Sequence, residues 1–222
     1  MFTHSLENQG WLRAKWQSLA TSVAADRAAA DAVWDELIRH YSEPQRVYHN
    51  LSHIMLMLRY ADKHRSQINN PETVQFAIWF HDVIYDTHLK DNERRSAKWA
   101  SRAMLAMQVD EHHVRPVVEC IEATERHELP LQHAPDLSLF LDMDLAILGA
   151  KENIYREYSE LIRTEYAWLP IAHYRLGRGK FLQRFLARPA LFFTATIGAD
   201  FEHQARINLE TELRELSHIK TA

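Results

Sequence analysis

Residues 71–91 read PETVQFAIWFHDVIYDTHLKD, and the rest of the chain is predicted to be organised around this segment. A helix is predicted to begin here, because Asn70 is a favoured N-cap and Pro71 suits the first helical position. One face of that helix follows the i, i+3, i+4, i+7 spacing, and its members are Val74, Ala77, Ile78 and His81. The ring of His81 is therefore predicted to point into the protein.

Two aspartates follow this histidine. Asp82 is its immediate neighbour, and Asp86 comes one turn later, on the same side of the predicted helix as Asp82. Polar groups on an inward face cost free energy unless they are satisfied, and a metal ion would satisfy them. A hydrogen-bonded core histidine beside a helix-end aspartate explains the pair equally well. The choice between this and a metal site therefore depends on other parts of the chain.

The composition is that of a single globular domain. The chain has 222 residues, of which 46% are hydrophobic and 25% charged, and this length supports one sizeable core. Only 5 residues are glycine, which argues against a turn-rich β protein and against glycine loops that cradle phosphate.

Charge and cysteine content exclude several functional classes. A net charge of −4 gives no reason to expect binding to nucleic acid or to a membrane surface. The single cysteine, Cys120, cannot form an internal disulfide, and its apolar surroundings predict a buried, inert thiol. Because the chain shows neither a signal sequence nor a long apolar run, we expect a soluble cytoplasmic protein.

Helical periodicity recurs along the whole chain. It predicts helices over residues 3–19, 26–41, 91–107, 114–128, 151–168 and 200–216, one that begins at His49 or Asn50, and a cationic one within residues 173–194. Residues 137–149 are ambiguous, because LFLDMD alternates like a strand while the leucine spacing fits a helix. A helix is the better choice, since no other segment offers a strand partner. The predicted fold is all-α.

Three predicted helices each carry metal-ligating side chains near an inward face: His53 on one, His81 and Asp82 on the second, and Asp142 on the third. Two imidazoles and two carboxylates without a thiolate suit Mn²⁺, Fe²⁺, Co²⁺ or Ni²⁺, and such a set also accepts Zn²⁺ or Mg²⁺. Four protein ligands would leave octahedral positions for water and a substrate oxygen, as metal-assisted hydrolysis requires.

This pattern, H…HD…D, resembles the HD superfamily of metal-dependent phosphohydrolases. The strings RVYHNLSHI, FHDVIYD, DNERRSA and LDMDLAILG, within residues 46–149, are similar to one predicted-phosphohydrolase branch, as is YRLGRGKFLQRFL further on. The resemblance implies one all-α HD-type domain over residues 1–222, in which helices of residues 1–45 and 150–222 pack on the metal-site core. It also implies a divalent metal and hydrolysis of a phosphate ester or anhydride, often in a nucleotide, by metal-activated water.

Carried onto this chain, the resemblance gives the ligand roles to His53, His81, Asp82 and Asp142. His49 competes with His53 as first ligand, and Asp144 competes with Asp142. The remaining roles are hypotheses. Asp86 is the first candidate for general base and Glu93 the second. The phosphate contacts are assigned to Arg46, His49 and Arg175 or Arg178, and Asp144 is a candidate for another contact with the substrate.

Two further points stay open at this stage. A mononuclear site is favoured, although His127 and Glu93 could contribute to a second metal. The expected partner is a small phosphorylated substrate, while its identity, the oligomeric state and the pathway do not follow from the sequence. The alternatives to an enzyme are a non-catalytic regulatory protein that binds metal and nucleotide, and a metal-free helical interaction protein.

Overall fold

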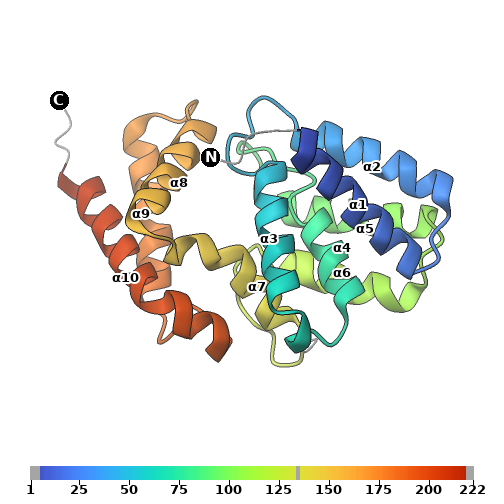
Figure 1. Cartoon of the computed structure of the whole chain (residues 1–222). Helices are drawn as coiled ribbons and strands as arrows, with labels where there is room; N and C mark the ends of the chain where they lie inside the picture. Colours follow the sequence, from blue (N-terminus) through green and yellow to red (C-terminus); the bar gives the residue numbers. More distant parts are fainter. Residues whose placement is uncertain (1–5, 134–135, 219–222) are drawn as a thin grey trace. The chain divides into compact units, whose positions relative to one another are not determined.

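The computed structural model describes residues 6–133 and 136–218, and these residues form an all-α fold (Figure 1). No strand occurs within those two ranges. The α-helices are α1 (Leu6–Ser22), α2 (Arg27–Tyr41), α3 (Leu51–Lys63), α4 (Pro71–Phe80), α5 (Asn92–Ala106), α6 (Glu111–Ala123), α7 (Leu137–Leu145), α8 (Glu152–Glu165), α9 (Ile171–Leu186) and α10 (Ala195–His218), with short 3₁₀ helices η1 (Arg65–Gln67) and η2 (Ala146–Gly149).

The chain divides into two compact units, one ending at Leu141 and the other beginning at Asp142. The division falls inside α7, and therefore within the predicted metal-site core of residues 46–149. The arrangement as one domain over residues 1–222 stays a prediction. None of the described helices has the length and apolar character needed to cross a membrane.

Helix α4 forms the centre of the first unit. It packs against α1, α3, α5 and α6, and all of its residues except Glu72 and Gln75 are buried. Trp16 of α1 makes edge-to-face contacts with the three aromatic rings of α4, those of Phe76, Trp79 and Phe80. Because nearly every side of α4 is covered, its apolar residues are not confined to the one face that the spacing predicted.

The predicted start of α4 is confirmed. The side chain of Asn70 accepts a hydrogen bond from the Thr73 amide at 3.1 Å, and Pro71 occupies the first turn. The buried carboxylate of Asp136 fixes the approach to the helix, since it accepts the backbone N–H groups of Asn69 and Asn70 at 2.9 and 2.7 Å. The α4 N-terminus is thus held by a local cap and by a residue far along the sequence.

The predicted continuation of this helix is wrong. α4 ends at Phe80, and residues 81–84 form a turn, so Asp86 does not lie one helical turn beyond Asp82. His81 occupies the C-cap position with near-helical torsions (φ −58°, ψ −36°), and its N–H still bonds to the Ala77 carbonyl at 2.9 Å. Its side chain therefore stays buried, as the spacing predicted.

In the second unit, α10 packs against η2, α8 and α9. Gly149 at the end of η2 allows close contact with α10, because a Cβ atom there would lie 2.5 Å from Phe201 Cβ. The prediction of helix over residues 137–149 is confirmed, with α7 passing into η2. The N-terminal helix, predicted from residue 3, is observed from Leu6; residues 1–5 lie outside the described part.

Candidate metal centre

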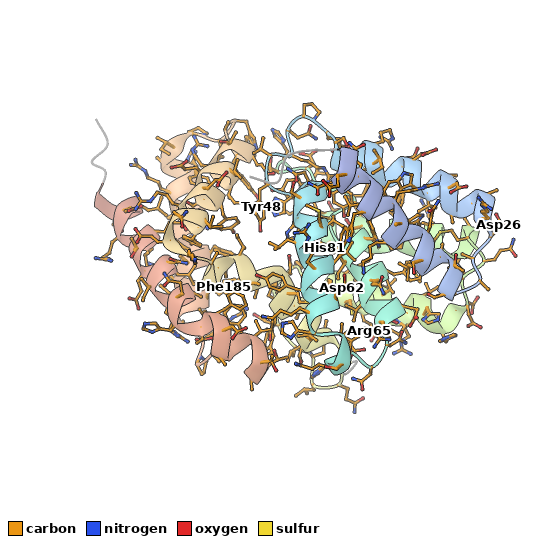
Figure 2. All side chains as sticks on the ribbon, in the orientation of Figure 1. Asp26, Tyr48, Asp62, Arg65, His81 and Phe185 are labelled. Carbon is orange, nitrogen blue, oxygen red and sulfur yellow. The ribbon has the colours of Figure 1, made fainter. Side chains whose placement is uncertain are left out.

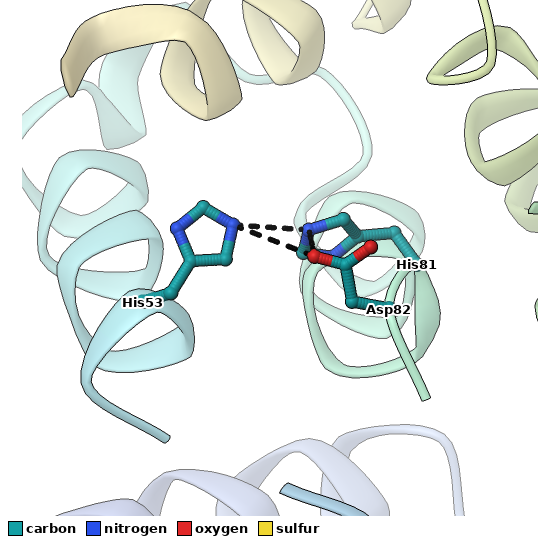
Figure 3. A group of neighbouring side chains, drawn as sticks. All are labelled: His53, His81 and Asp82. Atoms are coloured by element: carbon teal, nitrogen blue, oxygen red, sulfur yellow. Dashed lines mark hydrogen bonds and ion pairs between the residues drawn. The ribbon is translucent and has the colours of Figure 1, made fainter. Parts of the chain in front are cut away.

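Two histidines and one aspartate converge in the first unit (Figure 3). His53 lies on α3, whereas His81 and Asp82 lie in the turn that follows α4. The Nε2 atoms of the two histidines are 3.1 Å apart, and Asp82 Oδ2 lies 3.1 Å from His81 Nε2 and 3.9 Å from His53 Nε2. Within the described ranges this is the one group of three or more His, Cys, Asp or Glu side chains close enough to hold a metal ion.

A backbone carbonyl fixes the orientation and tautomer of His81. Its Nδ1 lies 3.0 Å from the carbonyl oxygen of Ile78, and a carbonyl oxygen only accepts, so Nδ1 donates the hydrogen bond. In the neutral ring the lone pair is then on Nε2, the atom that faces His53 and Asp82. Metal-binding histidines are typically oriented by such a bond from the other ring nitrogen.

The electrostatic environment keeps Asp82 ionised. Burial is the largest influence and would raise the pKa of its carboxyl, but three nearby imidazoles outweigh it when they are protonated: His81, through its charge and a hydrogen bond from its ring, and His49 and His53 through their charges. The net result is a pKa well below the ordinary value. The Asp82 side chain is 18% exposed, against 3% for His53 and 1% for His81, so the group opens to solvent on the carboxylate side.

These three side chains fit a divalent cation. They offer two imidazole nitrogens and one carboxylate oxygen, all within 4.8 Å of one another. This donor set suits a first-row transition metal, and three ligands leave coordination positions for other oxygen donors. His53, and not His49, belongs to the group.

Aromatic rings lie beside the group. The His49 ring stacks on Tyr85 with centroids 4.3 Å apart and meets the His53 ring edge-on at 5.9 Å. The centroid of the Tyr48 ring lies 5.3 Å from that of the His53 ring. Figure 2 labels Tyr48 and His81 among all the side chains. His49 precedes the α3 N-cap, Asn50, so it is not helical. Its predicted contact with substrate phosphate stays a prediction.

Arg46, which the sequence analysis assigned to the substrate phosphate, is instead bonded to groups of the protein itself. Its side chain is fully buried, and its guanidinium bonds to the carboxylate of Glu43 and to the carbonyl oxygens of Asp82 and Val83. The guanidinium therefore holds the turn that carries Asp82. A direct contact between Arg46 and a substrate phosphate stays a prediction that this geometry does not support.

The two candidates for general base differ in their surroundings. Asp86 is half exposed, and its carboxylate accepts hydrogen bonds from the backbone N–H and ring of His88, which together lower its pKa. Glu93, in the first turn of α5, is only partly exposed. Burial raises the pKa of Glu93, and the negative charge of Asp82 raises it further, so the electrostatic influence of Asp82 reaches this side chain.

Asp142, the fourth predicted ligand, lies in the second unit and is fully buried. Its carboxylate accepts the backbone N–H groups of Phe193 and Thr194, each at 2.7 Å, and the Thr194 hydroxyl at 2.6 Å. These bonds fix the residue that precedes α10. Asp144, the alternative ligand, is partly exposed. The pKa of the Tyr158 phenol is raised mainly by burial, and the Asp144 charge adds to this increase. A ligand role for either aspartate stays a prediction.

The two predicted phosphate-binding arginines of α9 also lie in the second unit. Arg178 is buried, and its guanidinium binds the Glu212 carboxylate through two bonds of 2.8 and 2.9 Å. The phenol of Tyr155 donates a further hydrogen bond to Glu212. Arg178 and Glu212 therefore form a structural ion pair that joins α9 to α10. Arg175 is partly exposed, and its role stays a prediction.

Sequence reasoning missed Tyr85 and Glu43. Tyr85 stacks on His49 and lies under the Arg46 guanidinium, and Glu43 binds Arg46 Nε at 3.0 Å. Neither residue has a spacing that links it to the histidines, so only the folded chain reveals it. Comparison with family models, with curated proteins and with solved structures finds no match for this chain.

Proposed function

We propose that the protein is a metal-dependent phosphohydrolase that cleaves a phosphate ester or anhydride in a small molecule such as a nucleotide. The observation that carries the proposal is the convergence of His53, His81 and Asp82 within 4.8 Å. The resemblance of the flanking strings to HD phosphohydrolases agrees with it. A divalent cation held by these side chains would acidify water and neutralise charge on a phosphoryl oxygen.

Glu93 is the better candidate for the proton acceptor in this reaction. A general base works best when its pKa lies near the working pH, and the pKa of Glu93 is raised by burial and by the Asp82 charge. Asp86 has the opposite shift, because its hydrogen bonds with His88 lower its pKa. We therefore reverse the order of the two candidates that the sequence suggested.

His49 is the side chain proposed to meet the phosphate. Its ring is held by stacking on Tyr85 and lies beside His53, and its charge acts on Asp82. A protonated imidazole in this position would donate a hydrogen bond to a phosphate oxygen. Such a contact requires no movement of the buried Arg46.

A phosphate-release screen tests the proposal. Nucleotides and simple phosphate esters are incubated with the protein and Mn²⁺, Co²⁺, Ni²⁺ or Mg²⁺. We expect metal-dependent release from one substrate class and none in His81→Ala. Bound metal without release from any compound would instead favour a regulatory protein that binds metal without turnover.

Two matched carboxylate variants test whether Glu93 or Asp86 is the general base. Glu93→Gln should lower kcat by about 10²–10⁴-fold while the metal content is unchanged. Asp86→Asn, which alters an exposed carboxylate paired with His88, should keep nearly full activity. The opposite result, with Asp86→Asn inactive and Glu93→Gln active, would reject the assignment of Glu93.

A further inference from the structure

We infer that Arg46 is a positioning residue that holds the Asp82 carboxylate in place for the metal. The inference rests on the metal site of the proposed function and does not depend on turnover. Arg46 comes 36 residues before Asp82 in the chain, yet its guanidinium donates to the Asp82 carbonyl oxygen. A second donation, 2.9 Å long, reaches the carbonyl oxygen of Val83.

The turn needs such support because it follows the end of α4. Residues 81–84 lie outside any helix, and helix ends leave backbone carbonyl groups without helical partners. A planar guanidinium can bind two neighbouring carbonyl oxygens at once. The two bonds fix the peptide groups on either side of Val83, and the first of these groups contains the Asp82 carbonyl. The direction of the Asp82 side chain follows from that backbone.

Arg46 is itself held firmly. Its Nε donates to Glu43 at 3.0 Å, and its guanidinium lies over the rings of Tyr41 and Tyr85, 5.3 and 5.5 Å from their centroids. The side chain has no exposed surface. Because each part of the guanidinium has a partner within the fold, the group is suited to support a ligand and not to bind substrate.

Arg46 is also bonded to both segments that carry the candidate ligands, the start of α3 and the turn that contains Asp82. The side-chain amide of Asn50 donates to the carbonyl oxygens of Arg46 and Val47, at 3.3 and 3.0 Å. Asn50 is the N-cap of α3, the helix that carries His53. Arg46 therefore links the start of the His53 helix, through its backbone, to the Asp82 turn, through its side chain.

The test compares the affinity of purified full-length variants for Mn²⁺, together with the visible absorption spectrum of the Co²⁺-loaded protein. Arg46→Lys keeps the charge but cannot bind Glu43 and both carbonyl oxygens. We expect its Kd for Mn²⁺ to rise at least about tenfold and its Co²⁺ spectrum to change. Unchanged affinity and spectrum would overturn the inference.

Arg206→Lys is the matched control. Arg206 also binds a glutamate through Nε, Glu202 at 2.8 Å, and backbone carbonyl oxygens, those of Arg188 and Pro189 at 3.0 Å, but it lies in the second unit. Its replacement should lower thermal stability and leave the Kd for Mn²⁺ within about twofold of wild type. An equal rise in Kd in both variants would mean that general loosening, and not positioning, weakens the metal site.

If Arg46→Lys does not fold, Glu43→Gln tests whether Arg46 positions Asp82. Among the guanidinium's contacts this variant weakens only the one at Nε, although it also alters the contacts of Glu43 with His40 and Gln45. Kd for Mn²⁺ should rise about threefold or more. No rise would overturn the inference. Wild-type protein that binds metal but releases no phosphate would refute the proposed hydrolase and leave the Arg46 result standing, whereas wild-type protein that binds no metal would refute both.

Discussion

The carbonyl oxygen of Ile78 determines which nitrogen of His81 can bind a cation. It accepts a hydrogen bond from Nδ1–H, with Nδ1 and the oxygen 3.0 Å apart, and this directs the Nε2 lone pair of the neutral ring toward His53 and Asp82. The sequence predicted the inward direction of His81 from its place in the apolar spacing. It could not predict the tautomer, because this depends on a turn that forms where α4 ends.

Cys120 offers a prediction about pH at the residue scale. Burial raises the pKa of its thiol from the ordinary 9.0 to about 12. Above pH 9 the unfolded chain would therefore lose the thiol proton while the folded chain keeps it, so the stability that this group contributes below pH 9 is lost as pH rises toward 12.

Urea unfolding of wild type and Cys120→Ala at about pH 8.5 and about pH 10.5 measures this effect. Between the two conditions the free energy of unfolding should fall by about 2 kcal/mol more in wild type than in the variant. Native protein should also resist thiol-alkylating reagents until it is unfolded. Equal pH dependence in the two proteins would contradict the buried, protonated thiol.

The residues of the candidate metal site could be predicted only in part from the sequence. His53, His81 and Asp82 were all named from their residue types and inward faces, and the structure brings these three together. The support by Arg46 and the stacking of Tyr85 could not be named, because both are long-range contacts that leave no periodic signal in the sequence.

At the scale of elements, the contact between η2 and α10 depends on Gly149. A Cβ atom at this position would lie 2.7 Å from the Phe201 carbonyl oxygen and 2.9 Å from its Cα. Gly149→Ala should therefore lower the free energy of unfolding by about 1–3 kcal/mol, because backbone atoms of α10 must move. Urea denaturation measures the change.

Gly177→Ala is the control for that experiment. Gly177 lies within α9, and nothing comes within 4 Å of a Cβ atom added there. Alanine should stabilise the helix by about 0.5–1 kcal/mol, because it restricts the unfolded chain more than glycine does. If both alanine variants changed stability alike, the close contact at Gly149 would not be the cause.

The Arg178–Glu212 ion pair connects α9 with α10, and both side chains are less than 10% exposed. Glu212→Gln should cost about 3–5 kcal/mol of stability, since it leaves a buried guanidinium without its counter-charge. The double variant Arg178→Met with Glu212→Gln should cost less than the sum of the two single changes. Additive costs in a double-mutant cycle would contradict a coupled pair.

Elements were easier to predict than their ends. Asp26, Asn50 and Asn70, at the predicted starts of three helices, each accept a backbone N–H as N-caps. Asp91, expected to cap the helix that follows it, makes no such bond, because its carboxylate binds Arg94 and Arg95. The end of α4 at Phe80 was missed, since the turn that follows is held by Arg46, which lies 36 residues before Asp82. Local patterns do not contain such a contact.

At the scale of the whole molecule, the predicted site residues fall in both compact units. His53, His81 and Asp82 belong to the first unit, and Asp142 and Arg178 to the second. The sequence grouped the ligand candidates by their donor types and inward faces and by one family resemblance, and neither reveals where compact units divide. In the structure Asp142 and Arg178 each have a structural role within the second unit.

Metal binding should stabilise the folded protein. A ligand that binds only the native state raises the free energy of unfolding by about 2.7 kcal/mol at a hundred times its Kd, which is roughly 5–10 °C in Tm for a chain of this size. Thermal scans with and without Mn²⁺ should show this shift in wild type. The shift should be absent in His81→Ala, and an equal shift there would place the metal elsewhere.

The most direct test of the metal centre is the metal content of purified protein, measured by mass spectrometry. Wild type and His88→Ala, which alters an exposed histidine that pairs with Asp86, should each bind about one divalent ion per chain. His81→Ala and Asp82→Asn should bind none. Full metal content in both of the latter variants, or no metal in wild type at saturating Mn²⁺ and Co²⁺, would contradict the metal centre formed by His53, His81 and Asp82.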